Sequence, residues 1–205
     1  MDFITHLKNT LKQHANEAYA VQMTSYLRGK FAFYGLKTKP RRELLKILVA
    51  EYTDEINENI SNITLTLLQQ PQRELHHCGI ELFAKHKRKS YQEADIELIE
   101  TLITTNSWWD TVDFISKQIL GVYLTQFPEA IEIVIDKFSA SNNMWLNRST
   151  LLFQLGYKNK TDQNILFAQY FVVFAAIRSK LKTQQQKLIK SMQLIKIVKL
   201  FILKI

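Results

Sequence analysis

Apolar residues recur along this chain at three- and four-residue intervals, which is the spacing that gathers them on one face of an α-helix. The stretches YQEADIELIETLITT and ENISNITLTLLQQ both follow this spacing. The stretch RRELLKILVAEY shows it at Leu44, Leu45, Leu48, Val49 and Tyr52. No convincing segment alternates apolar and polar residues in the way that a half-buried strand does. The pattern therefore predicts an all-α fold.

Short polar turns separate the predicted helices. The 205 residues include only 5 Gly and 3 Pro. Pro40, Pro71 and Pro128 each precede an amphipathic run, where a proline removes no helical hydrogen bond. Helix pairs recur at roughly 35–40 residues, which is the scale of HEAT and armadillo repeats. This rhythm predicts a HEAT- or armadillo-like helical-repeat solenoid, and a compact helical bundle is the alternative.

Positive charge is concentrated near the C-terminus. The net charge is +8, yet residues 163–205 hold eight basic and no acidic residues, which leaves 19 of each kind before them. We therefore predict a helical-repeat domain over 1–167 and a divergent basic, apolar segment over 168–205. One hypothesis for this segment is a shifted reading frame. The alternative is a divergent end that packs as a cap or binds an anionic surface.

Several classes of site are excluded by composition. Cys78 is the only cysteine, so neither an internal disulfide nor a cysteine zinc site can form, and a reducing cytoplasm is expected. The longest uncharged apolar run, residues 164–177, is shorter than the roughly 18–20 residues of a membrane-spanning helix.

His76, His77 and Glu81 lack the spacing of a metalloprotease motif. We expect no metal, no cofactor, no membrane association and a monomer.

The stretch SWWDTVDFISKQIL combines a predicted core face with a second, chemically distinct face. As a helix with Ser107 at its N-cap, it places Trp109 and Asp113 together at positions i and i+4. An aromatic ring beside a carboxylate can hold a cation. The alternative is a second packing tryptophan beside a solvated acid. The core face would consist of Trp108, Val112, Ile115 and Ile119.

Two further stretches could contact phosphate. In NNMWLNRSTLLFQLGYKNK, Trp145 and Arg148 share a helix face, although an arginine lying over an apolar ring is the more ordinary interpretation. The stretch YLRGKFAFYGLKTKPRRELLK is rich in cationic and aromatic residues and could form a phosphate-binding rim. A solvated basic face is the alternative there. Its cations are Arg28, Lys30, Lys37, Lys39, Arg41 and Arg42.

In combination, SWWDTVD, NMWLNRSTLLFQLGYK and YLRGKFAFYGLKTKPRRELLK closely resemble the AlkD-type DNA glycosylases over roughly residues 1–167. The resemblance implies a HEAT-like solenoid that binds duplex DNA and removes cationic N-alkylated purines such as 3-methyladenine and 7-methylguanine. It implies that Asp113 is the catalytic carboxylate, that Trp109 contacts the deoxyribose and that Arg148 holds a phosphate. Tyr26 matches a tyrosine of the DNA-facing surface. From the basic stretch we also expect Lys37, Lys39 and Arg41 to contact DNA.

Two departures from the family pattern affect the expected activity. The family has a lysine eight residues after the phosphate-binding arginine, and this chain has Gly156 there. The family also has a second sugar-contacting tryptophan further on, but no tryptophan follows Trp145 here. Three functions therefore stay open: a glycosylase, a helical DNA-binding protein that has lost excision, and an α-helical scaffold with a basic amphipathic end.

Overall fold

The computed structural model describes residues 1–180, which are helical apart from the connecting turns and loops and one isolated bridge between Ala32 and Gln72. The all-α prediction is confirmed. The chain divides into two compact units, Met1–Ser90 and a second that begins at Tyr91. No helix within the described residues is long and apolar enough to cross a membrane.

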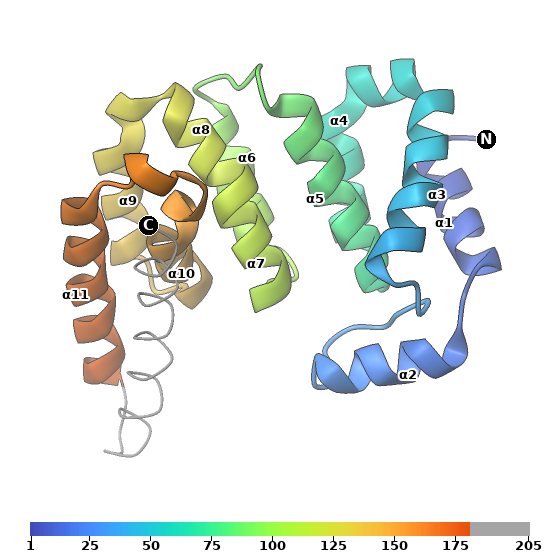
Figure 1. The fold of residues 1–205 in the computed structure, drawn as a ribbon, viewed down its shortest axis with the longest axis horizontal. Coiled ribbons are helices and arrows are strands. Elements are labelled where there is room, and N and C mark those ends of the chain that lie inside the picture. The colour runs from blue at the N-terminus through green and yellow to red at the C-terminus, as the bar shows by residue number, and fades with distance from the viewer. Residues whose placement is uncertain (181–205) are drawn as a thin grey trace. The chain divides into compact units, whose positions relative to one another are not determined.

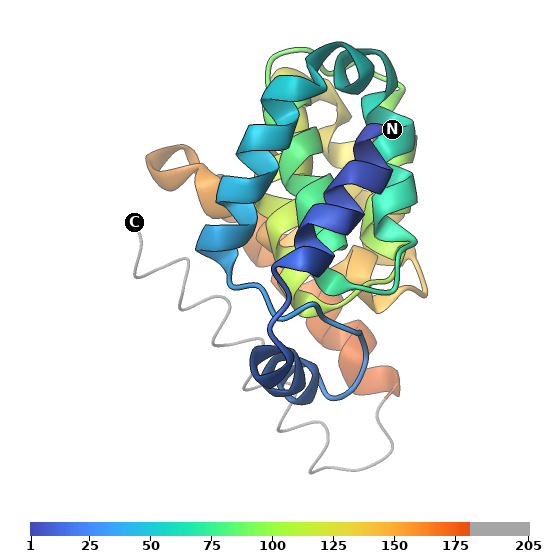
Figure 2. The ribbon, with the colours of Figure 1, turned by 90° about the vertical axis from the view of Figure 1, so that its right-hand side faces the viewer.

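Five helices build the first unit: α1 (Phe3–Gln13), α2 (Glu17–Tyr26), α3 (Thr38–Glu51), α4 (Thr53–Leu68) and α5 (Arg73–Lys87). Helices α4 and α5 lie side by side as an antiparallel pair (Figure 1). Figure 2 shows α1 against α3 and α4, with α2 set apart from them. The apolar stripe of α1 is fully buried, whereas α2 buries none of its residues, so α2 is held mainly through its ends.

A buried carboxylate organises the loop between α2 and α3. Glu74 is almost fully buried and accepts hydrogen bonds from the backbone N–H groups of Tyr34, Gly35 and Leu36. Gly35 has a φ of +89°, and a Cβ there would lie 2.0 Å from the carbonyl oxygen of Asn16. Only glycine therefore lets the loop approach the beginning of α2 so closely.

The second unit begins with α6 (Asp95–Thr104) and α7 (Trp109–Ile115), followed directly by a π-helical turn, η1 (Ser116–Leu120), and α8 (Gly121–Gln126). A 3₁₀ turn, η2 (Pro128–Ala130), leads into α9 (Ile131–Ala140) and α10 (Met144–Leu152). Two further 3₁₀ turns, η3 (Phe153–Gly156) and η4 (Lys158–Lys160), precede α11 (Gln163–Lys180). Figure 1 labels α6 to α11, and its colours follow their order along the chain.

Helix beginnings agree only partly with the sequence expectations. Pro40 lies in the first turn of α3 and Pro128 begins η2, as expected, while Pro71 lies two residues before α5. Ser107 is not the N-cap of α7, because Trp108 holds that position with extended backbone angles. The Ser107 hydroxyl donates instead to the carbonyl oxygen of Ile103.

The predicted C-terminal segment is only partly described. Helix α11 runs through the predicted boundary between residues 167 and 168. Residues 181–205 lie outside the described part of the chain, and with them lies most of the segment that the reading-frame hypothesis concerns.

Candidate active site and nucleic-acid contacts

Helix α7 presents two different faces, as its sequence predicts. Val112, Ile115 and Ile119 are fully buried in the core of the second unit. Trp109, which begins the helix, keeps 39% of its surface exposed, and Asp113 lies one turn further along at an intermediate level of burial. The pair therefore borders solvent rather than the core.

Helix α10 is fixed beside α7 by packing and by a buried amide. The rings of Trp108 and Trp145 lie 5.8 Å apart, centroid to centroid, in a tilted arrangement. The Asn147 side-chain amide donates to the carbonyl oxygens of Phe138 and Ser139, at 2.8 and 3.1 Å, and so ties α10 to the last turn of α9. These contacts place the α10 side chains that face α7 in a defined register.

Arg148 of α10 and Asp113 of α7 form a two-point ion pair. The Arg148 Nε donates to Asp113 Oδ1 at 2.6 Å, and Nη2 donates to Oδ2 at 2.8 Å. The arginine side chain is 26% exposed and the aspartate side chain 34%. This fork-to-fork geometry fixes the plane of the carboxylate. The two residues are 35 positions apart in sequence.

Asp113 and Arg148 both keep hydrogen-bonding groups that could contact a ligand. Each oxygen of a carboxylate has two acceptor sites, so Asp113 keeps free lone pairs after both bonds to Arg148. Arg148 uses Nε and Nη2 on Asp113, so its Nη1 is left to donate to another acceptor. Together with the exposed face of Trp109, the pair can bind a group that develops positive charge next to an anionic phosphate.

Four of the predicted DNA contacts lie in the first unit, and three of them are exposed. Tyr26 ends α2 and is 72% exposed. Lys37 is the N-cap residue of α3, and its ammonium lies over the Tyr19 ring at 4.1 Å from the centroid. Lys39 is exposed in the first turn of the same helix. All three side chains are placed where a ligand could reach them.

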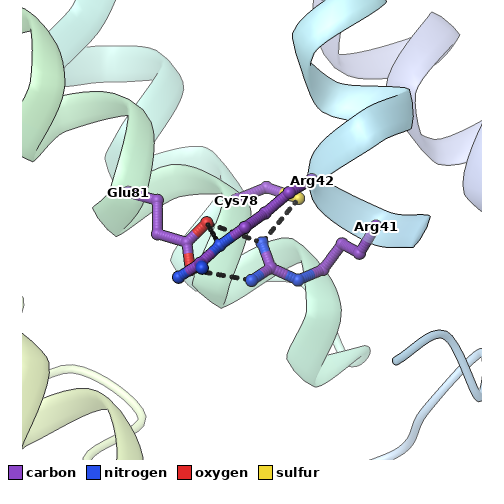
Figure 3. Close-up of polar contacts among 4 residues, drawn as sticks. All are labelled: Arg41, Arg42, Cys78 and Glu81. Atoms are coloured by element: carbon purple, nitrogen blue, oxygen red, sulfur yellow. Dashed lines mark hydrogen bonds and ion pairs between the residues drawn. The ribbon is translucent and has the colours of Figure 1, made fainter. Parts of the chain in front are cut away.

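Arg41 has a different environment from the other predicted DNA contacts. It is only 3% exposed, and its two Nη groups donate to both oxygens of Glu81 at 3.1 and 2.8 Å. Arg42, from the same helix, donates to the same two oxygens from Nε and Nη2 (Figure 3). Cys78 Sγ accepts a further bond from Arg41 at 3.6 Å. Arg41 therefore joins α3 to α5 inside the first unit, and a DNA phosphate cannot reach it as it stands.

Cys78 is fully buried, as predicted for a small core residue. Burial raises the pKa of its thiol to about 11, and the neighbouring Arg41 guanidinium offsets only part of that effect. The thiol is therefore protonated at neutral pH and is a poor nucleophile.

The sequence alone does not indicate either of the carboxylate pairings, Asp113 with Arg148 and Glu81 with Arg41. Opposite charges on neighbouring helices are the only sequence signal for such pairs, and that signal does not indicate which acid meets which base. Within the described residues, no group of three or more His, Cys, Asp or Glu side chains could hold a metal ion.

Comparison with known proteins agrees with this description. The family model described as DNA alkylation repair enzyme matches residues 7–185, which extends beyond the stretch that carried the sequence resemblance. The structure is similar to that of a predicted DNA alkylation repair enzyme from Enterococcus faecalis, with a TM-score of 0.69 and 22% identity. That match covers 82% of this chain and 76% of the other, and it confirms the helical-repeat fold. No curated protein matches the chain significantly.

Proposed function

The chain belongs to the DNA alkylation repair enzyme family, and we propose that it is a DNA glycosylase. Its substrates would be cationic N3- or N7-alkylated purines in duplex DNA, and the bond hydrolysed would be the N-glycosidic bond. The observation that carries this proposal is the Asp113 carboxylate, oriented at two points by Arg148 and located one turn from the exposed Trp109 ring.

The proposed reaction suits a site that offers one carboxylate. An N3- or N7-alkylated purine already carries a positive charge, so it leaves as a neutral base when the bond to C1′ breaks. The positive charge then moves to the sugar, where a fixed carboxylate stabilises it. Water adds to C1′, and its proton passes to Asp113 or to solvent. The steps balance without a metal or a cofactor.

Each neighbouring residue has a separate role in this proposal. Trp109 packs its ring against the deoxyribose, and the negative face of the ring adds to the attraction for the developing cation. Arg148 orients Asp113 and uses its remaining Nη1 group on a backbone phosphate. Tyr26, Lys37 and Lys39 supply further contacts to DNA from the first unit. Arg41 is left out, because its guanidinium is buried against Glu81.

The experiment is to measure release of 7-methylguanine and 3-methyladenine from methylated duplex DNA. We expect Asp113→Asn to lower the single-turnover rate by about 10²–10³-fold, since loss of one electrostatic stabiliser has effects of that order. Asp136→Asn is the matched control, because Asp136 is an exposed acid on α9 of the same unit. Its rate should equal that of the unaltered protein.

Two results would contradict the proposal in different ways. Unchanged release by Asp113→Asn would exclude Asp113 as the stabilising carboxylate. A folded protein that binds the methylated duplex but releases no base would favour the DNA-binding function without excision.

A further inference from the structure

A lysine one turn beyond Asp113 has no role in the function proposed above. Trp109, Asp113 and Lys117 follow one another at four-residue intervals, and the helix changes from α to π geometry at Ser116. Lys117 is partly buried, yet its ammonium makes no hydrogen bond or ion pair with any of the residues that the structure describes. Lys117 therefore lies one turn beyond Asp113 in sequence and has no assigned partner among these residues.

The π-helical turn brings Lys117 against the segment that follows α10. The N–H of Gly121 closes the turn on the carbonyl oxygen of Ser116. A Cβ at Gly121 would lie 2.2 Å from the carbonyl oxygen of Phe153, so glycine permits this close approach. The Tyr157 hydroxyl donates to the Gly121 carbonyl oxygen at 2.7 Å and holds the two segments together. Turns of this kind are often found at functional sites.

The Lys117 side chain then lies across an exposed glycine. Among the described residues, and apart from its own chain neighbours, a Cβ built at Gly156 would lie within 4 Å of the Cε and Cγ atoms of Lys117, at 3.8 and 3.9 Å. Both distances are ordinary van der Waals contacts, so packing would tolerate a side chain at this position. The aliphatic part of Lys117 therefore rests on Gly156, and its ammonium is carried to the surface of the second unit.

The charge balance of the site indicates what Lys117 would bind. Asp113 and Arg148 neutralise each other, so their pair contributes no net attraction for a polyanion. Lys117 adds one positive charge, which would repel a cationic purine but attract a phosphate. Lysine also offers only donors, which suits phosphate oxygens.

We propose that Lys117 holds a DNA backbone phosphate next to the nucleotide whose sugar faces Asp113. This inference rests on the proposed function, and it adds a second phosphate contact, from the π-helical turn, to the one proposed for Arg148. Arg148 is neutralised by Asp113, so Lys117 supplies the net positive charge at the site.

The test is the salt dependence of binding to an unmodified DNA duplex. The slope of log K against log salt concentration is negative, and each phosphate contact adds about 0.9 to its magnitude. Lys117→Met keeps most of the side-chain packing and should reduce the magnitude of the slope by this amount. The ratio of affinities at 50 and 200 mM salt would then fall by about 3.5-fold. Lys137→Met is the control, because it removes the same charge from a lysine already paired with Glu100.

A double variant separates a role of the charge from a role in packing. Lys117→Met combined with Gly156→Lys puts an ammonium back at the same surface from the other segment. We expect it to restore the slope, which a purely structural role of Lys117 would not do.

The outcomes distinguish this inference from the function on which it rests. A Lys117→Met protein that binds DNA with the slope of the unaltered chain overturns the inference and leaves the glycosylase proposal in place. Failure of the double variant to recover the slope overturns it as well. If the unaltered chain does not bind duplex DNA at all, the proposed function and the inference are both wrong.

Discussion

Glu81 holds two arginines of α3, and removing its charge should destabilise the first unit. Its side chain is 14% exposed, and that of Arg41 is 4% exposed. Glu81→Gln keeps the shape but leaves the buried guanidinium without a counter-charge, with the Arg42 cation still beside it. Breaking a buried pair in this way costs about 3–5 kcal/mol. We expect the variant to lose free energy of unfolding of that order at pH 7.

The stability that Glu81 contributes should depend on pH, because its pKa is lowered in the folded protein. Burial alone would raise the pKa of Glu81, but the hydrogen bonds from Arg42 and Arg41 outweigh it and lower the pKa below the usual value. A lowered pKa contributes stability above the pKa of the unfolded chain, and this stability is lost as the pH falls through the folded value. The difference between the unaltered protein and Glu81→Gln should therefore shrink below about pH 4.

Urea unfolding at pH 7 and at pH 3–4, followed by circular dichroism, measures both quantities. The matched control is Glu43→Gln, because Glu43 is an exposed acid on the same helix as the two arginines. Its effect should stay within about 0.5 kcal/mol. The reasoning is refuted if Glu81→Gln behaves like this control at pH 7, or if its deficit is as large in acid as at neutral pH.

Three other residues of the first unit give simpler predictions. Burial raises the pKa of Cys78 to about 11, so a thiol reagent at pH 8 should modify the native protein far more slowly than the urea-unfolded chain; equal rates would show that the thiol is accessible. Gly35→Ala should cost more than about 3 kcal/mol in urea unfolding, because φ is +89° and the new Cβ would meet backbone atoms. Gly29→Ala, at φ +71° with open space around it, should cost only about 1 kcal/mol.

Helical periodicity was sufficient to predict the fold class and much of the core. Of the predicted core face, Val112, Ile115 and Ile119 are fully buried, because a three- and four-residue spacing leaves few other arrangements. Trp108, the fourth member, precedes α7 as its N-cap and is only partly buried. The same spacing put Trp109 and Asp113 on one face. A hydrophobic pattern thus determines what faces inward on a single helix.

The sequence does not predict which side chains of different helices contact one another. A run of basic residues is usually a solvated face, and nothing in PRRELLK marks Arg41 as the buried member and Arg42 as the exposed one. The difference arises because Glu81 approaches from α5, 40 positions away in sequence. The prediction of Ser107 as the N-cap of α7 is wrong for a similar reason. Its hydroxyl donates to the carbonyl oxygen of Ile103 in α6 and does not cap α7.

Gly156 shows how the three-dimensional arrangement changes the meaning of a sequence departure. The family resemblance leads one to expect a lysine at this position, and its absence reads as a lost phosphate contact. In the structure, the Lys117 side chain lies against this position, with its Cε and Cγ atoms 3.8 and 3.9 Å from where a Cβ at 156 would stand. An ammonium can therefore reach the same surface from the π-helical turn, although the two positions are 39 residues apart. If the double variant Lys117→Met, Gly156→Lys binds DNA as the unaltered chain does, a lysine at 117 and a lysine at 156 are interchangeable. Gly156 would then mark a phosphate-binding charge that has moved to another position, and not one that has been lost.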